Sequence, residues 1–282
     1  MIIKDFLPNP AFSEFVQCYR IVHFEFDNSD TIPFKAYPPK PEECLYFILR
    51  DSLMVEFNNS KEKNILLPII LIGQQTSVTR RYLRKDFLNL QIVFQPTGLF
   101  RLTGIPSFEL TDQFIDATAV FSKNIRFIHE QLQNAKSYNN MLLIADQFVA
   151  DMANNARKDV HLLDSVSKVM MKSHGNISLD WLAKESCLST KQFNRKFNER
   201  AGINPKTYSK IIRFTKVFNT KNRYPEMDWL RIAIECDYFD YQHLVKDYKK
   251  FTGLTPNEFH LLESNSPECK LGLSGELYRD RM

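Results

Sequence analysis

The first third of the chain alternates hydrophobic and polar positions with the two-residue period of β-strands. The alternation is clearest at residues 19–26, and a cluster of polar turn residues follows it at 27–30. Four short apolar runs come next, at residues 44–49, 53–57, 65–72 and 88–94. Several short strands at regular spacing predict a β-rich, barrel-like or sandwich domain.

From about residue 119 the period lengthens to that of helices. Ile125, Ile128 and Leu132 follow helical spacing, and the helix expected at 140–152 carries an apolar stripe. The stripe fits a core face or a dimer seam. The polar stretch 154–159 then indicates a domain boundary.

The fold class we expect is α+β, in three parts. Residues 1–155 form a β-rich, barrel-like sensing or dimerisation domain with trailing helices, and residues 156–263 form an all-α domain. Residues 264–282 show little periodic apolar pattern, which predicts a mobile tail.

An internal repeat runs through the helical half. The segment 202–208, Gly-Ile-Asn-Pro-Lys-Thr-Tyr, recurs at 253–259 as Gly-Leu-Thr-Pro-Asn-Glu-Phe. Leu182-Ala183 likewise recurs as Ile232-Ala233. Two copies of one helical unit therefore stand about 50 residues apart, which is a repeat spacing.

Each copy has the layout of a helix-turn-helix. In the first, Ser178 and Ser189 are the expected N-caps, and the second helix runs to about residue 201. Phe193 and Phe197, four residues apart, face the core. The outward face then holds the predicted base-contacting residues Lys191, Asn194, Arg195 and Asn198, among which Arg and Asn match guanine and adenine edges in a major groove.

The second copy repeats this plan with a poorer reading face. Asp228 and Asp240 are the expected caps, and Leu244 and Tyr248 face the core. The predicted base-contacting residues are Tyr241, Gln242, Val245 and Lys246. Since Val245 offers only an apolar contact, suited to a thymine methyl, we expect the first copy to read more of the DNA.

These fragments resemble the C-terminal module of the AraC/XylS family of transcription regulators, over roughly residues 160–262. The resemblance implies double helix-turn-helix architecture, double-stranded DNA and RNA polymerase as partners, and an N-terminal domain that senses a small-molecule effector or forms a homodimer. The family usually has glycine in each turn, where this chain has Cys187 and Asp237. A left-handed cysteine costs roughly 1 kcal/mol, so we expect another backbone conformation at Cys187.

The joining helix, about 205–221, sets the separation of the two reading helices in the family. Its basic residues fit a phosphate-contacting face or a solvated one. The predicted phosphate contacts are Ser189, Arg213, Lys249 and Lys250, and the resemblance gives Arg213 a structural or phosphate-contacting role.

The charge distribution also differs between the helical and the β-rich parts of the chain. The whole chain carries +4, but residues 160–263 carry +5 and residues 1–159 carry −1. A basic half joined to a near-neutral half fits a chain of which one part meets a polyanion, and it equally fits a solvated basic surface with no partner.

The sequence offers no support for an enzyme active site. Phosphate-binding glycine motifs and a nucleophile elbow do not occur, and only His23 of the six histidines lies in the β region. One histidine cannot make a multi-histidine site, so we expect no enzyme activity, no metal and no cofactor. A ligand pocket lined by Tyr37, Glu43, Tyr46 and Arg50 is one interpretation, and ordinary core and surface residues are the other. The basic run 80–85 could form a second nucleic-acid patch, but it is interpreted as a solvated turn or an intersubunit surface.

Five scattered cysteines indicate reduced thiols, and the longest apolar stretch, 65–72, is too short to cross a membrane. We therefore expect a cytoplasmic protein without a membrane partner. The alternative to a DNA-binding regulator is a ligand-binding or protein-interaction module whose helical half no longer reads DNA.

Overall fold

The computed structural model describes residues 2–26, 32, 34–57, 60, 62–121, 124–154, 156 and 160–272. The turn predicted at 27–30 and most of the boundary predicted at 154–159 lie outside these residues. None of the helices in the described ranges has both the length and the apolar character needed to cross a bilayer.

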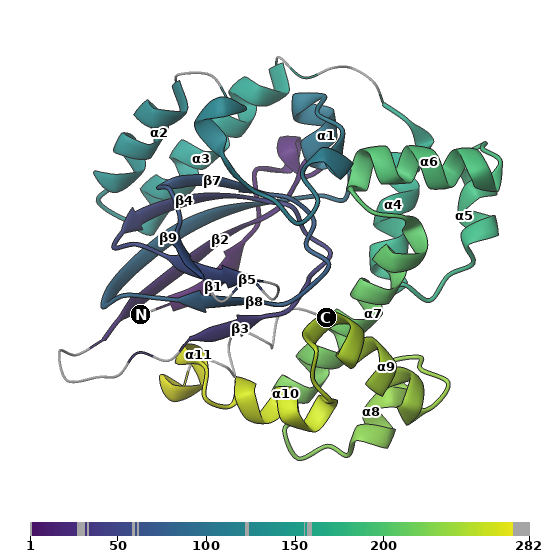
Figure 1. Cartoon of the computed structure of the whole chain (residues 1–282). Coiled ribbons are helices and arrows are strands. Elements are labelled where there is room, and N and C mark those ends of the chain that lie inside the picture. The colour runs from purple at the N-terminus through teal and green to yellow at the C-terminus, as the bar shows by residue number, and fades with distance from the viewer. Residues whose placement is uncertain are drawn as a thin grey trace.

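Two antiparallel sheets make up the N-terminal half (Figure 1). In spatial order, the first contains β1 (Ile2–Phe6), β2 (Val16–Glu25), β9 (Asp86–Phe94), β4 (Cys44–Arg50), β7 (Ile69–Ile72) and β10 (Phe114–Asp116). The second contains β3 (Lys35–Tyr37), β8 (Thr79–Tyr82), β5 (Met54–Phe57) and β6 (Lys63–Ile65). Within the described ranges, strands pair only inside their own sheet, so the domain is β-rich without closing into a barrel.

The apolar run at 65–72 is divided between the two sheets. β6 ends at Ile65 and β7 begins at Ile69, with Pro68 between them. Proline has no amide hydrogen to donate to a ladder, which favours a break at this point. One apolar run therefore serves two strands.

Three helices pack on the outer face of the six-stranded sheet (Figure 1). They are α1 (Gly98–Thr103), α2 (Asn124–Gln133) and α3 (Tyr138–Asn154). Ile125, Ile128 and Leu132 are buried against this face, as their helical spacing predicts. The α3 stripe, including Phe148 and Val149, packs into the same core, so its buried part serves as a core face.

Eight helices follow in the described part of the C-terminal half. They are α4 (Leu162–Lys172), α5 (Leu179–Glu185), α6 (Thr190–Ala201), α7 (Pro205–Arg223), α8 (Trp229–Glu235), α9 (Tyr241–Thr252), α10 (Pro256–Glu263) and α11 (Pro267–Lys270). One continuous core joins α4 to α10 and also takes in Ala36 of β3 and Val78, directly before β8. The helical half therefore packs against the β-rich half.

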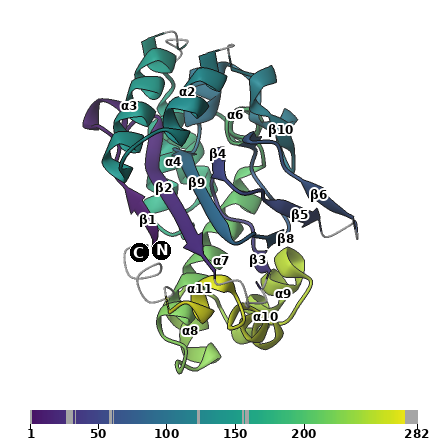
Figure 2. The ribbon, with the colours of Figure 1, turned by 90° about the vertical axis from the view of Figure 1, so that its left-hand side faces the viewer.

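The segment predicted to be a mobile tail contributes α11 to this contact. Figure 2 shows α10 and α11 beside β3. Lys35 of β3 forms ion pairs with Glu263 and Glu268, both buried. Residues 273–282 lie outside the described part of the chain.

Candidate nucleic-acid interface and ligand cavity

The first helix-turn-helix, α5 and α6, has the caps and the core that its sequence predicts. The Ser178 side chain accepts a hydrogen bond from the amide of Trp181, and Ser189 forms a capping box with Gln192. Phe193 and Phe197 are fully buried. Because these anchors fix the rotation of α6, Lys191 and Arg195 are exposed on its other side, while Asn194 and Asn198 are partly exposed.

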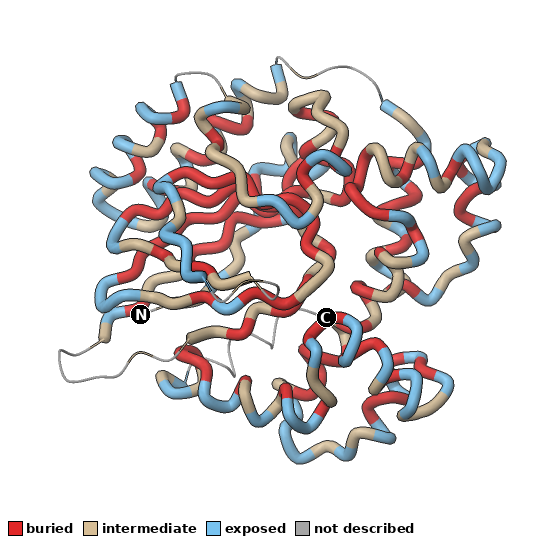
Figure 3. The backbone as a smooth tube through the Cα atoms, viewed as in Figure 1, coloured by how far each residue is buried: buried red, intermediate tan, exposed pale blue. Residues whose placement is uncertain are grey.

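The second unit, α8 and α9, is built in the same way. Asp228 caps α8, and Asp240 caps α9 by accepting from the amide of His243. Leu244 and Tyr248 are buried. Of the predicted base-contacting residues, Gln242 and Lys246 are exposed and Tyr241 and Val245 partly exposed. Figure 3 shows exposed positions along the outer rim of the helical half.

Both turns adopt the left-handed conformation that glycine usually takes. Cys187 has a φ of 53° and Asp237 a φ of 61°. The expectation of another conformation at Cys187 is therefore wrong, because the two helices of a unit need this turn whatever residue occupies it. Asp237 also pairs with Lys216 at 3.2 Å.

The basic residues of α7 make contacts inside the helical half. Arg213 lies 3.7 Å from Asp247 and stacks over the Tyr238 ring at 4.5 Å. Lys210 pairs with the same Asp247 at 3.4 Å. Arg213 thus has a structural contact, which leaves its predicted phosphate contact open.

The remaining predicted phosphate contacts lie at helix ends. Ser189 is exposed at the start of α6, with its hydroxyl engaged in the capping box. Lys249 and Lys250 are exposed in the last turn of α9. All three are accessible to a backbone phosphate.

Sequence reasoning missed Phe239. This side chain is 91% exposed, directly before the cap of α9, and its ring meets that of His243 edge-on at 5.9 Å. The sequence did contain a signal for it, because Phe239 is a large apolar residue between the two predicted helices of the unit. It adds an exposed apolar side chain beside the start of α9.

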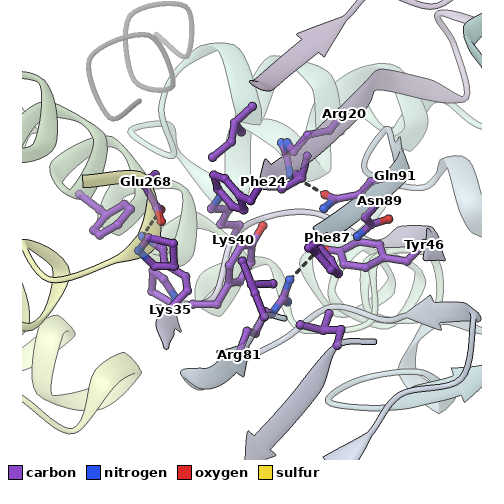
Figure 4. Close-up of a pocket in the computed structure, with 18 residues that line it drawn as sticks. Arg20, Phe24, Lys35, Lys40, Tyr46, Arg81, Phe87, Asn89, Gln91 and Glu268 are labelled. Carbon is purple, nitrogen blue, oxygen red and sulfur yellow. Dashed lines mark hydrogen bonds and ion pairs between the residues drawn. The ribbon is translucent and has the colours of Figure 1, made fainter. Parts of the chain in front are cut away.

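A cavity of about 80 Å³ lies between the two sheets and the helical half (Figure 4). Its apolar wall includes Val22, Phe24 and Phe87 from the strands. Phe218 of α7, with Pro267 and Glu268, closes the side toward the helical half. The cavity therefore touches both halves of the chain.

Arg81 is one of five charged residues that line this cavity, with Arg20, Lys35, Lys40 and Glu268. It is 6% exposed, donates from Nη1 to the Tyr46 hydroxyl at 2.8 Å, and lies 3.5 Å above the Tyr37 ring. Burial alone would lower the pKa of Arg81, but the adjacent Tyr46 and Tyr37 hydroxyls raise it above its ordinary value. Arg81 therefore stays charged inside the protein.

Buried polar atoms without a hydrogen-bond partner also line this cavity. The Nε of Arg81 is one, and both side-chain polar atoms of Asn89 are others. Asn89 is only 1% exposed. Because buried polar groups are nearly always paired in native proteins, these atoms indicate a missing partner such as a ligand or a water molecule.

Two of the four predicted pocket residues line the cavity. Tyr37 and Tyr46 do, but Arg50 lies exposed at the end of β4, 3.3 Å from Asp86. Glu43 lies at the contact with the helical half, where the Ser107 hydroxyl is 3.4 Å from its carboxyl oxygen. Arg81 was missed, since the run 80–85 was interpreted as a surface; that interpretation is wrong for Arg81, which points inward from β8.

The second helix of the first unit, α6, is docked on the β-rich half. The Ser107 hydroxyl of the short 3-10 helix η2 (Ser107–Glu109) donates to the carbonyl of Arg200 at 3.0 Å. Thr111 donates to the carbonyl of Gly202 at 2.7 Å. At the second unit, the amide of Val78 donates to the carbonyl of Phe251 at 2.9 Å. Both units are thus held on the same body.

Two family models match the sequence. Residues 182–260 match the family described as "Helix-turn-helix domain", a range that includes α6, α7 and α9. Residues 4–116 match one described as "Domain of unknown function (DUF6597)". No curated protein matches the chain.

Among solved structures, the chain is similar to ToxT from Vibrio cholerae. A variant of apo ToxT from strain SCE256 is 10% identical, with a TM-score of 0.48 over 86% of this chain and 97% of that one. Wild-type ToxT from that strain with a bound unsaturated fatty acid is 11% identical, with a TM-score of 0.45 over 86% of this chain and 94% of that one.

Proposed function

We propose, from the premise that residues 182–260 are a helix-turn-helix domain of the AraC type, that this chain is a sequence-specific DNA-binding transcription regulator. Within this proposal residues 156–263 bind DNA and residues 1–155 bind a small-molecule effector or mediate dimerisation. RNA polymerase and a second copy of the chain are the further partners that the proposal implies.

The observation that carries the proposal is the pair of outward faces on α6 and α9. Arg195 and Lys191 stand exposed on a helix whose opposite side is anchored by two buried phenylalanines. A forked guanidinium on such a helix matches the acceptors of guanine in a major groove. The +5 charge of residues 160–263 supplies attraction to phosphates.

Selection of a random duplex library on the full chain, at near-physiological salt, tests this function. Two short enriched blocks about one helical turn apart are expected, one for each unit. A single block would assign base reading to one unit. A folded chain that enriches no sequence would contradict the proposal and favour the interaction module instead.

We further propose that the cavity binds a small organic anion with an apolar body. Arg81 supplies a buried positive charge with an unpaired Nε, and Asn89 supplies an unpaired donor and acceptor. The surrounding Val22, Phe24 and Phe87 suit a hydrocarbon or aromatic group. A mainly apolar lining with polar groups that fix the orientation of the ligand is typical of ligand sites.

Asn89→Leu separates this ligand role from a structural one. Replacing a buried, unpaired polar group by an apolar one of similar shape is neutral or stabilising, so the ligand-free variant should unfold at the same or a higher urea concentration. Its affinity for carboxylates identified by thermal-shift screening of the wild type should fall about tenfold. Destabilisation of the ligand-free variant, or undiminished carboxylate binding, would contradict the assignment.

A further inference from the structure

Three side chains that can bind a metal meet on the outer face of the β2–β9 pair. They are His23, Glu25 and Asp86, and one ligand atom from each lies within 4.8 Å of the others. The Nε2 of His23 is 3.1 Å from an oxygen of Glu25 and 3.6 Å from an oxygen of Asp86. Ligands bound tetrahedrally at about 2.0–2.1 Å stand about 3.3 Å apart, so the two distances bracket that value.

Strand pairing sets the two carboxylates against each other. Glu25 and Asp86 are direct partners in the β2–β9 register. Like charges directly opposite on neighbouring strands are destabilising. Arg50, 3.3 Å from Asp86, offsets one of the two negative charges, and a cation between the carboxylates would offset the other.

The His23 ring is oriented as a metal-binding imidazole usually is. Its Nδ1 lies 2.6 Å from the Tyr138 hydroxyl at the start of α3. Its Nε2 is buried, has no hydrogen bond, and faces the two carboxylates. Metal-bound histidines typically donate their second ring N–H to an oxygen acceptor, which fixes the tautomer that leaves the other nitrogen free to bind.

We propose that His23, Glu25 and Asp86 form a Zn²⁺ site with one nitrogen and two oxygen ligands. Zinc accepts imidazole and carboxylate ligands together, whereas Mg²⁺ and Ca²⁺ prefer oxygen alone. A water molecule would complete a tetrahedral set. The sequence excludes a site built from several histidines, and this site contains one. Its other two ligands are carboxylates, which the pairing of β2 with β9 brings together.

The site lies on the opposite side of β2 from the cavity. Val22 and Phe24 line the cavity, and the residues that follow each of them, His23 and Glu25, carry the proposed ligands. Alternation along the strand therefore puts metal and effector on two faces of one ladder. The proposal stands whether or not the helical half reads DNA.

Zinc titration of the full chain tests it. The chain carries Cys187→Ser, which removes the exposed thiol, and is freed of metal with a chelator before calorimetry with ZnCl₂. One ion per chain is expected. Glu25→Gln, an exposed change, should weaken binding at least tenfold, and Tyr138→Phe about tenfold through loss of the orienting hydroxyl. Arg50→Gln should tighten binding, since it removes a nearby positive charge.

Two control variants show whether zinc binds outside the proposed site. Glu130→Gln changes an exposed carboxylate on α2, and His243→Gln disrupts the exposed His243–Asp240 pair. Both should leave the zinc affinity unchanged. Absence of binding at micromolar Zn²⁺, or equal affinity in Glu25→Gln, Tyr138→Phe and the parent, would overturn the proposal.

Discussion

Cys187 and Asp237 occupy the same place in their two units, with φ angles of 53° and 61°. A residue with a Cβ pays roughly 1–2 kcal/mol for the left-handed conformation, and aspartate tolerates it better than cysteine. Cys187→Gly should therefore raise the free energy of unfolding by about 0.5–1 kcal/mol, after allowance for the greater freedom of glycine in the unfolded chain. Urea unfolding measures this change in the free energy of unfolding. Asp237→Gly should show a smaller increase, because it also removes the ion pair with Lys216. A loss of stability in Cys187→Gly would contradict this account of the turn.

Replacing Arg195 tests whether one side chain contacts a base of the DNA. Arg195→Ala should cost about 1–3 kcal/mol on the selected site and relax preference at one base position. Lys249→Ala removes the same charge from an exposed helix end. It should weaken binding to all sequences alike and reduce the salt slope by about 1. Gel-shift titration over a salt series distinguishes the two; an unchanged preference in Arg195→Ala would exclude base reading there.

At the scale of elements, the helices of the reading units could be predicted closely, because each depends on nearby residues. Ser178, Ser189, Asp228 and Asp240 cap the helices that their positions predict. The sheets could not be predicted to the same depth. The inward direction of Arg81 follows from the pairing of β8 with β3 and β5, and that pairing joins segments distant in sequence. Half of the predicted pocket was therefore misplaced, and Arg81 and Asn89 were missed.

Gly202 and Gly253 end α6 and α9 in equivalent positions but in different surroundings. Both have positive φ, 83° and 76°. A Cβ on Gly202 would meet the Thr111 hydroxyl at 2.9 Å and the Ser107 carbonyl at 3.1 Å, whereas a Cβ on Gly253 would meet nothing within 4 Å.

Alanine at the two positions therefore measures the docking of α6. Gly253→Ala should cost about 1–2 kcal/mol, for the backbone conformation alone. Gly202→Ala should cost more, because it also pushes α6 away from η2. Urea unfolding compares them, and equal losses would mean that the contact between α6 and η2 contributes little to stability.

At the scale of the whole molecule, the contact between the halves contains a buried carboxyl. Burial raises the pKa of Glu43 to about 8, against an ordinary 4.5. The native state thus holds a proton that the unfolded chain has released between these pH values. The resulting stabilisation is complete below about pH 4.5 and is lost as pH rises through about 8.

Glu43→Gln, which resembles the protonated form, should remove this dependence. The wild type should lose stability relative to the variant between pH 5.5 and 8.5, as measured by urea unfolding at several pH values. Parallel curves for the two proteins would show that Glu43 does not carry a raised pKa.

The closing wall of the cavity has a consequence for the order of events during synthesis. The strands of the β-rich half are complete by residue 116, whereas Pro267 and Glu268, which close the cavity, are made about 150 residues later. At roughly 5–20 residues per second, the ribosome takes about 8–30 s over that interval. During this time the cavity of the newly made β-rich half lacks its wall of Pro267 and Glu268. Lys35 has not yet formed its ion pairs with Glu263 and Glu268. Pro267 and Glu268 therefore complete the cavity wall only after the strands that form most of it have been made.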